Sequence, residues 1–448
     1  MTTNKSRATL IKGATLVDSQ VNLNAVKDIL INEAGLIEAI EDELEAPQGA
    51  QVIDASGLIG MPGMVDIHVH FRDPGQEYKE DIVSGCHAAT HGGFTDVCTM
   101  PNTAPTCDSA PVVEFQRARA ERTGLARVHP IGALTIGLKG EAMAEHYTMA
   151  EAGAVGFSDD GRGVQQAGIL RTAMEYLTAI DGLAMSHCED ESISGKGVVN
   201  EGIVSTRLGV AGWQALAEEI HIMRDIELSK LTGCRLHICH ITSRAGVEAV
   251  ARAKEVGAPV TCEVTPHHLF LNEDDITTAY DTNIKMNPPL RTKEDMEFLQ
   301  EALIDGRIDC VVTDHAPHAA HEKALEFENA PFGIVGLETS LPLVYTNLVA
   351  TGRMSLERLS EVMASTPRKI IKLERVALEV GSPATLTFFD PTTEHMVDPE
   401  TFYSKSSNQP FTGMKLTGWA KHVFINGKQT LNDGVVAGCG CAEEHLIS

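Results

Sequence analysis

The middle of the chain alternates short apolar runs with longer stretches of helical periodicity. Each apolar run has the length of a strand and ends in polar residues, and the stretch that follows spaces its apolar side chains as a helix does. Eight such units can be counted. The predicted strands cover residues 64–70, 94–100, 127–134, 154–158, 183–187, 235–240, 259–264 and 309–313. The predicted helices include residues 111–122, 165–180, 213–231, 243–256 and 292–305.

This alternation predicts an α/β protein with a closed (β/α)8 barrel of the TIM type. Strands that alternate with helices pair in parallel, and eight units are enough to close a barrel. The active site of such a barrel lies at the carboxyl ends of its strands. A doubly wound open sheet is the structural alternative.

The two ends of the chain differ from the middle. Short β-type runs occupy residues 9–11, 28–31 and 51–53 near the start, and residues 385–389 and 422–427 near the end. Neither end has enough strands to bury a core alone, so we expect both to combine into one small β-sandwich. The predicted domains are residues 1–60 and 375–448 for the sandwich and residues 61–374 for the barrel.

Composition limits the classes of function. The chain has 448 residues, is 43% hydrophobic and contains no apolar run long enough to span a membrane. Its start leads into strand-like sequence and not into a signal peptide, so we expect a cytoplasmic protein. The formal net charge of −26 argues against nucleic acid or an anionic membrane as a partner. An anionic substrate would have to be held by local cations.

The ten cysteines are scattered, and several lie in apolar strand-like runs. This pattern indicates reduced, buried residues and not the disulfide framework of a secreted protein. Cys439 and Cys441 form the one close pair. We interpret the pair as incidental tail sequence, because no second pair completes a zinc knuckle.

A pair of histidines ends the first predicted barrel strand. His68 and His70 are two residues apart, and side chains at that spacing point the same way on a strand. Two neighbouring imidazoles can share one metal ion. A lone pair of this kind is weak support for a metal site, and its weight depends on the ends of the other strands.

Further metal-type side chains follow the other predicted strands. They are Asp159 and Asp160 after the fourth strand, His187 at the end of the fifth, His240 at the end of the sixth and Asp314 after the eighth. Each has an ordinary alternative: the adjacent acids as a turn, either single histidine as a core residue. Their coincidence with successive strand ends favours a metal site. Four histidines and two carboxylates are suitable ligands for two Zn²⁺ ions. A paired zinc site of this kind is suited to amide hydrolysis.

The other histidines are assigned different roles. His267 and His268 follow the seventh predicted strand, where we expect them to support the rim through hydrogen bonds. The remaining histidines considered are interpreted as structural or solvated, and they are His87, His91, His129, His146 and His221.

With these residues in place, the chain resembles the amidohydrolase superfamily and, within it, the bacterial class I dihydroorotases. The resemblance runs over nearly the whole chain. Its motifs are HVHFRDPG at 68–75, MPNT at 100–103, FSDDG at 157–161, HCED at 187–190, HICHIT at 237–242, EVTPHH at 263–268, KMNPPLR at 285–291, TDHAPH at 313–318 and APFGIVGLET at 330–339.

The resemblance implies a zinc-dependent hydrolase of pyrimidine biosynthesis. Such enzymes interconvert (S)-dihydroorotate and N-carbamoyl-L-aspartate. Carried over by motif, His68, His70 and Asp314 would hold one zinc ion, His187 and His240 would hold the other, and one of the adjacent acids would bridge them. The resemblance favours Asp160 as the bridge, although its place at the strand end does not separate it from its neighbour.

The bridge distinguishes this chain from part of the superfamily. Hydantoinases, allantoinases and many dihydroorotases bridge their metals with a carboxylated lysine at the end of the fourth strand. Residues 154–161 contain no lysine. An aspartate bridge is typical of the class I dihydroorotases, so this departure favours that class.

The resemblance also assigns substrate contacts. Arg72, Asn102 and His318 would bind the substrate carboxylate, and Asn287 with the backbone of Phe332 and Gly333 would bind the ring amides. A guanidinium suits a carboxylate because it grips it through two parallel hydrogen bonds. Asp314 is expected to act as base toward the attacking water and then as acid toward the leaving nitrogen. Residues 319–332 are predicted to form a mobile lid.

Two rival functions stay open at this stage. A hydantoinase or allantoinase would share the fold and the metals but should lack Arg72 and Asn102 in these contexts. An inactive structural partner of aspartate transcarbamoylase is the other rival, and the complete ligand set argues against it. For the active protein we expect a homodimer, with association with aspartate transcarbamoylase left open.

Overall fold

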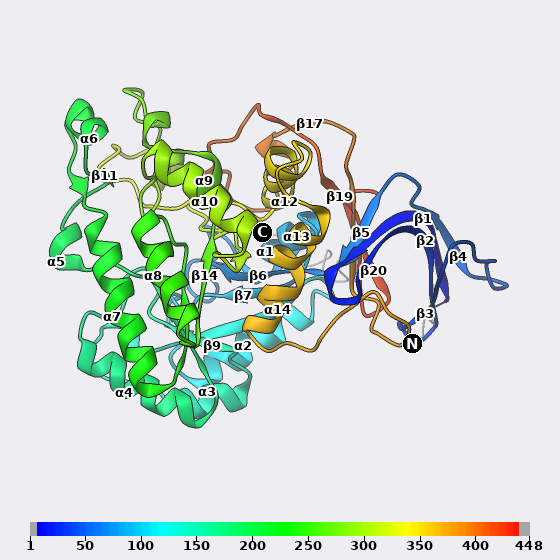
Figure 1. Ribbon diagram of the computed structural model, residues 1–448, viewed down its shortest axis with the longest axis horizontal. Helices are drawn as coiled ribbons and strands as arrows, with labels where there is room; N and C mark the ends of the chain where they lie inside the picture. The colour runs from blue at the N-terminus through cyan, green and yellow to red at the C-terminus, as the bar shows by residue number, and fades with distance from the viewer. Residues whose placement is uncertain (1–6, 439–448) are drawn as a thin grey trace.

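The computed structural model describes residues 7–438 as a barrel with a β-sheet beside it (Figure 1). The barrel strands lie parallel, each beside the next in chain order. Strand β6 closes the ring, because Val69 bridges to His315, which follows the last strand. The strands are β6 (Met64–Val69), β7 (Phe94–Thr99), β8 (Arg127–Ala133), β9 (Gly156–Ser158), β10 (Leu183–Ser186), β13 (Arg235–Ile238), β14 (Val260–Val264) and β15 (Cys310–Val311). The predicted barrel is confirmed, and the open sheet is excluded.

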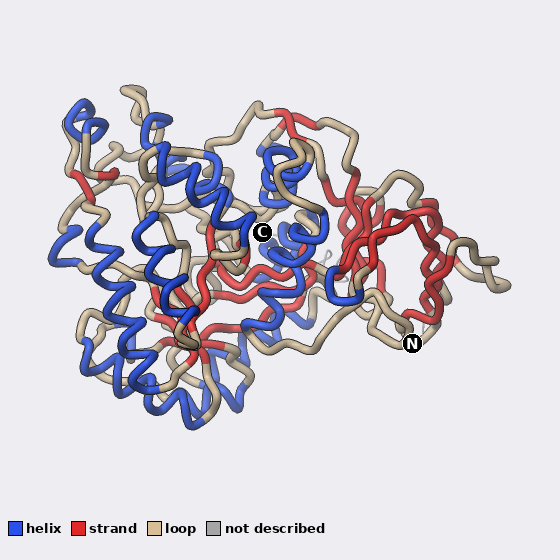
Figure 2. Tube along the Cα trace, viewed as in Figure 1, coloured by secondary structure: helices blue, strands red, loops and turns tan. Residues whose placement is uncertain are grey.

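Helices surround the strands (Figure 2). The five predicted helices all form, and each begins and ends within three residues of its expected bounds. The longer helices are α1 (Ile82–His91), α2 (Ala110–Glu121), α3 (His146–Ala152), α4 (Ala167–Ala179), α7 (Leu216–Thr232), α8 (Arg244–Glu255) and α10 (Lys293–Asp305). Local signals set their ends: Thr292 caps α10 by accepting a hydrogen bond from the Asp295 backbone, and Gly306 ends it at a φ of 91°.

Shorter elements lie in the loops and after the last barrel strand. They are α5 (Glu191–Ser194), β11 (Val199–Asn200), α6 (Ile203–Leu208), β12 (Gly212–Trp213), α9 (Pro266–Phe270), α11 (Ala320–Lys323), α12 (Ser340–Val344), α13 (Leu356–Ser360) and α14 (Thr366–Ile370).

The barrel is packed on both sides of its strands. Inside it, alternate strand residues such as Ile67, Cys98 and Met185 form one buried cluster. Their neighbours along the strands, such as Val97 and Ala184, belong to the larger cluster that packs the helices against the barrel. Because the interior is filled, the rim at the carboxyl ends is the place where polar side chains can gather.

Both chain ends build the second part, as predicted. Its nine-stranded sheet is joined by the antiparallel pairing of β5 (Ile59–Pro62) with β16 (Leu386–Asp390). Leu16, Phe388 and Phe424 share a separate core between the two ends. The other strands are β1 (Thr9–Asp18), β2 (Leu23–Ile31), β3 (Ile37–Glu41), β4 (Gln51–Asp54), β19 (Trp419–Ile425), β20 (Lys428–Asn432) and β21 (Val435–Val436). The domain bounds themselves stay a prediction.

One segment between β16 and β19 leaves this sheet and crosses the top of the barrel, near the label β17 in Figure 1. It contains β17 (His395–Met396) and β18 (Lys415–Leu416). Residues 402–411, named the C-terminal strap here, hydrogen-bond to barrel loops. The Tyr403 backbone donates to Glu338, and the Ser406 hydroxyl donates to the Lys79 carbonyl. The C-terminal part of the chain therefore reaches the barrel rim.

Eight cysteines lie within residues 7–438, where all are buried and none forms a disulfide with another of them, as expected of reduced core residues. Cys439 and Cys441 lie outside the described residues. Among the described residues, no helix combines the length and apolar character that crossing a membrane requires.

Candidate active site

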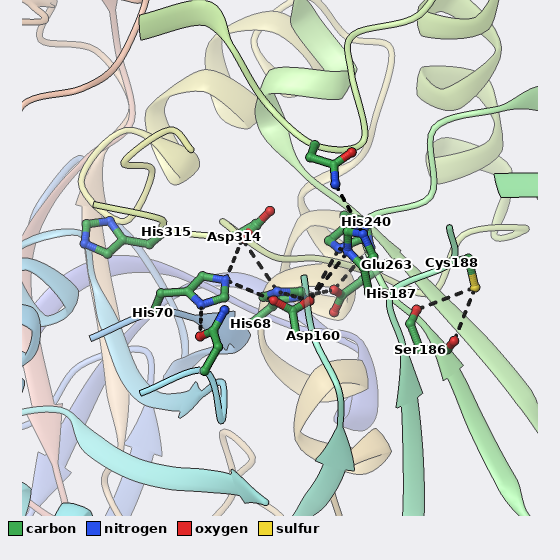
Figure 3. A network of polar contacts seen from close by, with 12 residues as sticks. His68, His70, Asp160, Ser186, His187, Cys188, His240, Glu263, Asp314 and His315 are labelled. Carbon is green, nitrogen blue, oxygen red and sulfur yellow. Dashed lines mark hydrogen bonds and ion pairs between the residues drawn. The ribbon is translucent and has the colours of Figure 1, made fainter. Parts of the chain in front are cut away.

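Six metal-type side chains converge at the carboxyl ends of the barrel strands (Figure 3). All six residues are buried. They come from the positions that the sequence predicted: His68 and His70 at the end of β6, Asp160 after β9, His187 after β10, His240 after β13 and Asp314 after β15. The closed barrel brings together residues separated by more than half of the chain.

Asp160 lies at the centre of this cluster. Its Oδ1 is 3.3 Å from His68 Nε2, 3.6 Å from His240 Nε2 and 3.8 Å from His187 Nδ1, and its Oδ2 is 3.4 Å from His70 Nε2. Burial raises the pKa of Asp160, but the surrounding histidines, above all His68, bring that pKa well below its usual range. One carboxylate thus contacts both histidine pairs.

The neighbouring acid points elsewhere. Asp159 accepts a 2.9 Å hydrogen bond from the Thr135 backbone and another from the Thr135 hydroxyl. It fastens the loop after β8 and contacts none of the six side chains through these bonds. The geometry therefore separates the two acids that the sequence pattern left equivalent, and Asp160 faces the histidines.

Asp314 lies on the His68 and His70 side of the cluster. Its Oδ1 is 3.0 Å from His70 Nε2 and 3.5 Å from His68 Nε2. Burial raises its pKa, but the two histidines outweigh that effect and hold the pKa below the usual range. Asp314 is therefore a carboxylate at neutral pH, able to bind a cation or accept a proton.

The cluster fits metal ions. Three of its buried polar atoms have no hydrogen-bond partner among the described residues, namely His68 Nε2, Asp160 Oδ1 and His240 Nδ1. Buried polar atoms normally have a hydrogen-bond partner, so three unpaired atoms in one cluster indicate that a ligand binds there. Three groups of ligand atoms within the cluster are close enough to hold an ion: His68, His70 and Asp160; Asp160, His187 and His240; and His68, His240 and Asp314. Imidazole and carboxylate suit a divalent metal.

Two glutamates that the sequence interpretation did not assign hold the histidines in place. Glu263 Oε1 lies 2.6 Å from His68 Nδ1, which directs the other ring nitrogen toward Asp160. Glu189 Oε2 lies 3.2 Å from His187 Nε2 and accepts a 2.9 Å hydrogen bond from Asn287. Burial opposes ionisation of both, yet the adjacent histidines lower the pKa of each to about 2. Their places inside the HCED and EVTPHH motifs were the available signal.

The six predicted substrate contacts line one cavity beside the metal-type cluster. Its volume is about 310 Å³. The residues are Arg72, Asn102, Asn287, His318, Phe332 and Gly333, and five of the six metal-type residues, all but His68, also line it. The structure therefore places the predicted substrate residues next to the predicted ligands, while their individual roles stay predictions.

Arg72 brings a buried positive charge to this cavity. The residue is 8% exposed, its Nε donates to the Pro317 carbonyl at 3.3 Å and its Nη2 lies 3.5 Å from His318 Nε2. Burial and the adjacent cations, Arg72 first among them, lower the pKa of His318 to about 2. His318 is therefore neutral at physiological pH, and Arg72 supplies the charge that an anion would require.

The backbone is unusual at three of these residues. Arg72, His240 and Asp314 have φ values of 60°, 33° and 45°, in the left-handed region that non-glycine residues seldom adopt. Such conformations cost free energy and concentrate at functional sites. Here they turn the chain at the ends of β6, β13 and β15, where the side chains enter the rim.

Of the seven other histidines considered above, six have side-chain hydrogen-bond partners. His268 lies 2.7 Å from Thr265 Oγ1 and 2.9 Å from the Pro288 carbonyl, in agreement with the expected supporting role. His267 Nε2 is buried and has no hydrogen-bond partner among the described residues. The five histidines interpreted as structural or solvated all have nearby polar partners: His87, His91, His129, His146 and His221.

Two lysines fasten residues 319–332, the segment predicted to be a lid. Lys285 Nζ donates to the carbonyls of Phe327, Glu328 and Ala330 at 2.6, 3.0 and 2.7 Å. Lys323 Nζ donates to two further carbonyls, those of residues 282 and 331, at 2.8 and 2.9 Å. The mobility of this segment stays a prediction, and any opening would have to break these bonds.

Comparison with known proteins decides the family. The Dihydro-orotase-like family model matches residues 57–246. A curated relative named Dihydroorotase from Desulforapulum autotrophicum is 45% identical over 419 residues, which cover 93% of this chain and 97% of the relative. The chain belongs to the dihydroorotase family. Another relative with that name, from Geobacillus thermodenitrificans, is 46% identical and covers 88% of this chain and 92% of its own.

Solved structures of similar fold bear other names. The L-hydantoinase (dihydropyrimidinase) from Arthrobacter aurescens matches with a TM-score of 0.85 and 29% identity, covering 96% of this chain and 97% of its own. A D-hydantoinase from Thermus sp. matches with a TM-score of 0.82 at 24% identity, over 96% of both chains, and shows the shared fold alone. The higher identity to the dihydroorotases favours that family over the hydantoinases.

Proposed function

We propose that this chain catalyses the reversible hydrolysis of the cyclic amide of (S)-dihydroorotate to N-carbamoyl-L-aspartate, a step of pyrimidine (UMP) biosynthesis. The chain is a hydrolase that acts on cyclic amide C–N bonds. The observation that carries the proposal is the buried Arg72 guanidinium in the cavity that also contains Asp160 and Asp314. A ring amide that bears a carboxylate matches this combination, and the relatives cited above bear the corresponding name.

We propose that two zinc ions bind the cluster. His68, His70 and Asp314 would hold one ion, His187 and His240 would hold the other, and Asp160 would bridge them. The shared position of Asp160 and its unpaired Oδ1 among the described residues support the bridge. Zinc bound there would make a water molecule a nucleophile near neutral pH and polarise the ring carbonyl.

The protein side chains would move the proton and orient the ring. Asp314, a carboxylate beside His70, would accept a proton from the attacking water and return it to the leaving nitrogen. Arg72, Asn102 and His318 would bind the substrate carboxylate from one side of the cavity. This orientation presents the amide carbonyl to the rim, which lowers the entropic cost of reaction.

Asn287, with the backbone of Phe332 and Gly333, would recognise the ring amides in the same cavity. Asn287 is held by Glu189, so the orientation of its amide is coupled to the neighbouring His187. Phe332 and Gly333 line the same cavity. Fixed polar groups around the cavity would hold the ring in one orientation.

The chemistry of the cavity separates this function from its rivals. Hydantoin carries no carboxylate, so a site for hydantoin has no need of a buried guanidinium, whose desolvation is costly without an anionic partner. An inactive partner of aspartate transcarbamoylase would not need all six metal-type residues in one cluster. We further propose a cytoplasmic homodimer, with association with aspartate transcarbamoylase as the alternative assembly.

The test combines metal content with substrate preference. Purified protein should contain two zinc ions per chain by elemental analysis and should open dihydroorotate faster than hydantoin or allantoin. One ion or fewer after purification in zinc would contradict the two-metal site. Faster hydrolysis of hydantoin or allantoin would contradict the substrate while leaving a metal-dependent cyclic amidase in place.

A further inference from the structure

Asn408 on the C-terminal strap lies behind the residues that line the substrate cavity. It lies between β17 and β18, in the segment that crosses the barrel top in Figure 1. The residue is 3% exposed, although its segment belongs in sequence to the terminal part of the chain. Its side chain does not line the cavity, yet it binds two segments that do.

Both N–H groups of the Asn408 side chain and one lone pair of its Oδ1 form hydrogen bonds. Its Oδ1 accepts a 3.0 Å hydrogen bond from the His318 backbone N–H. Its Nδ2 donates to the carbonyls of Ala316 and Gly333 at 3.1 and 3.0 Å. Its backbone carbonyl accepts from the Val335 N–H at 2.9 Å. One residue therefore joins the segment after β15 to the segment that follows the predicted lid.

The two joined segments form one wall of the cavity. Ala316, His318 and Gly333 all line it, and the Ala316 N–H donates to the Ile334 carbonyl at 2.9 Å. The approach at Gly333 is close, because a Cβ there would meet the Ala316 carbonyl oxygen at 2.5 Å. The two segments therefore lie at a short, fixed separation, and the Asn408 amide bridges them.

Only a side chain with both a donor and an acceptor at this distance fits the gap. Aspartate would place a second carboxylate oxygen against the carbonyls of Ala316 and Gly333, exchanging two hydrogen bonds for repulsion. Alanine would leave a buried N–H and two buried carbonyls without this partner. Either change would let His318 and Gly333 shift relative to Arg72.

We propose that Asn408 is a positioning residue that sets the substrate-carboxylate subsite by fixing His318 and Gly333. This inference rests on the proposed function, because it concerns the same cavity. Asn408 touches neither the metal ligands nor the substrate in this account, so its effect is exerted through the two segments that it joins. Displacement of a substrate-positioning group by about 1 Å is enough to lower catalytic efficiency about 100-fold.

The experiment compares Asn408→Asp and Asn408→Ala with Gln409→Glu. Gln409 is 2% exposed on the same strap, and within residues 7–438 its side chain hydrogen-bonds only to the local turn, with Thr412 and Phe411. Both Asn408 variants should raise the KM for dihydroorotate about 10- to 100-fold, the same range as for loss of a hydrogen-bond partner that orients a metal ligand, with a smaller change in kcat and with metal content retained. Gln409→Glu should leave KM near the wild-type value.

Several outcomes would overturn the inference. An unchanged KM in a folded Asn408 variant would do so. Loss of metal and kcat at constant KM, or failure of both Asn408 variants to fold while Gln409→Glu folds, would assign Asn408 a general structural role instead. A wild-type protein that does not open dihydroorotate would contradict the proposed function, whereas an active wild type with unaffected variants would contradict only this inference.

Discussion

His68 and Glu263 form a fully buried pair in which Nδ1 of the imidazole lies 2.6 Å from a carboxylate oxygen. Glu263 also lies 2.9 Å from His237 Nε2 through its second oxygen. A carboxylate on one ring nitrogen fixes the tautomer and orientation of a metal-binding histidine. The pair therefore presents His68 Nε2 to Asp160 and Asp314 in a single orientation.

The first prediction concerns this pair. Glu263→Gln should weaken metal binding about 10- to 100-fold, because the neutral amide orients and polarises His68 less well. Glu338→Gln is a matched control, since Glu338 is also buried and lies 2.6 Å from a histidine, His91. Metal affinity measured against a competing chelator should fall only in the first variant. Equal affinities in the two variants would contradict the role of Glu263.

The second prediction separates the two adjacent acids. Asp160→Ala should lose metal and activity together, because it removes the carboxylate that lies between both histidine pairs. Asp159→Ala should retain metal and lose mainly stability, since Asp159 hydrogen-bonds to Thr135. Elemental analysis and turnover of the two purified variants provide the comparison. A reversal of their effects would contradict the proposed bridge.

The third prediction concerns proton transfer by Asp314. Asp314→Asn preserves the shape of the side chain but cannot accept the proton of the attacking water. Turnover should fall by at least about 100-fold, the low end for loss of a general base. Kinetics on protein with measured metal content tests this. Near-normal turnover at normal metal content would exclude Asp314 as the base.

The fourth prediction concerns pH and Lys323. Burial, with the nearby Lys285 cation, lowers the pKa of Lys323 from 10.5 to about 7. Between these values the unfolded chain binds a proton that the folded chain releases, so stability should rise with pH through this window. Lys323→Met removes the effect. Urea unfolding at about pH 7 and about pH 9 should show wild type gaining free energy of unfolding relative to the variant. An equal or opposite pH dependence would contradict the lowered pKa.

Much of the architecture could be predicted from the sequence. The alternation of strands and helices predicted the barrel because apolar side chains repeat every two residues in a strand and every 3.6 residues in a helix. The two kinds of element can therefore be told apart in the sequence. The same alternation placed His68, His187 and His240 at one rim. The last predicted strand, residues 309–313, was longer than the observed β15 (Cys310–Val311), since the chain leaves the ladder to reach the turn at Asp314.

Other features required the folded chain. The orientations of Asp159 and Asp160 depend on the turn after β9, and adjacent residues of one type carry no signal for that choice. Glu189 and Glu263 act by contacting histidines, and the contact between Glu263 and His68 spans 195 residues. Asn408 lies beyond the barrel sequence altogether, so no strand pattern places it beside His318.

The most direct test of the account is the effect of Arg72→Met on two matched substrates. Dihydrouracil is dihydroorotate without its carboxylate. For dihydroorotate, kcat/KM should fall about 30- to 1000-fold, equivalent to roughly 2–4 kcal/mol for a lost charge-assisted partner, with metal content unchanged. The loss for dihydrouracil should be much smaller. Intact dihydroorotate hydrolysis in Arg72→Met would contradict the central claim that this buried guanidinium selects a carboxylate-bearing ring.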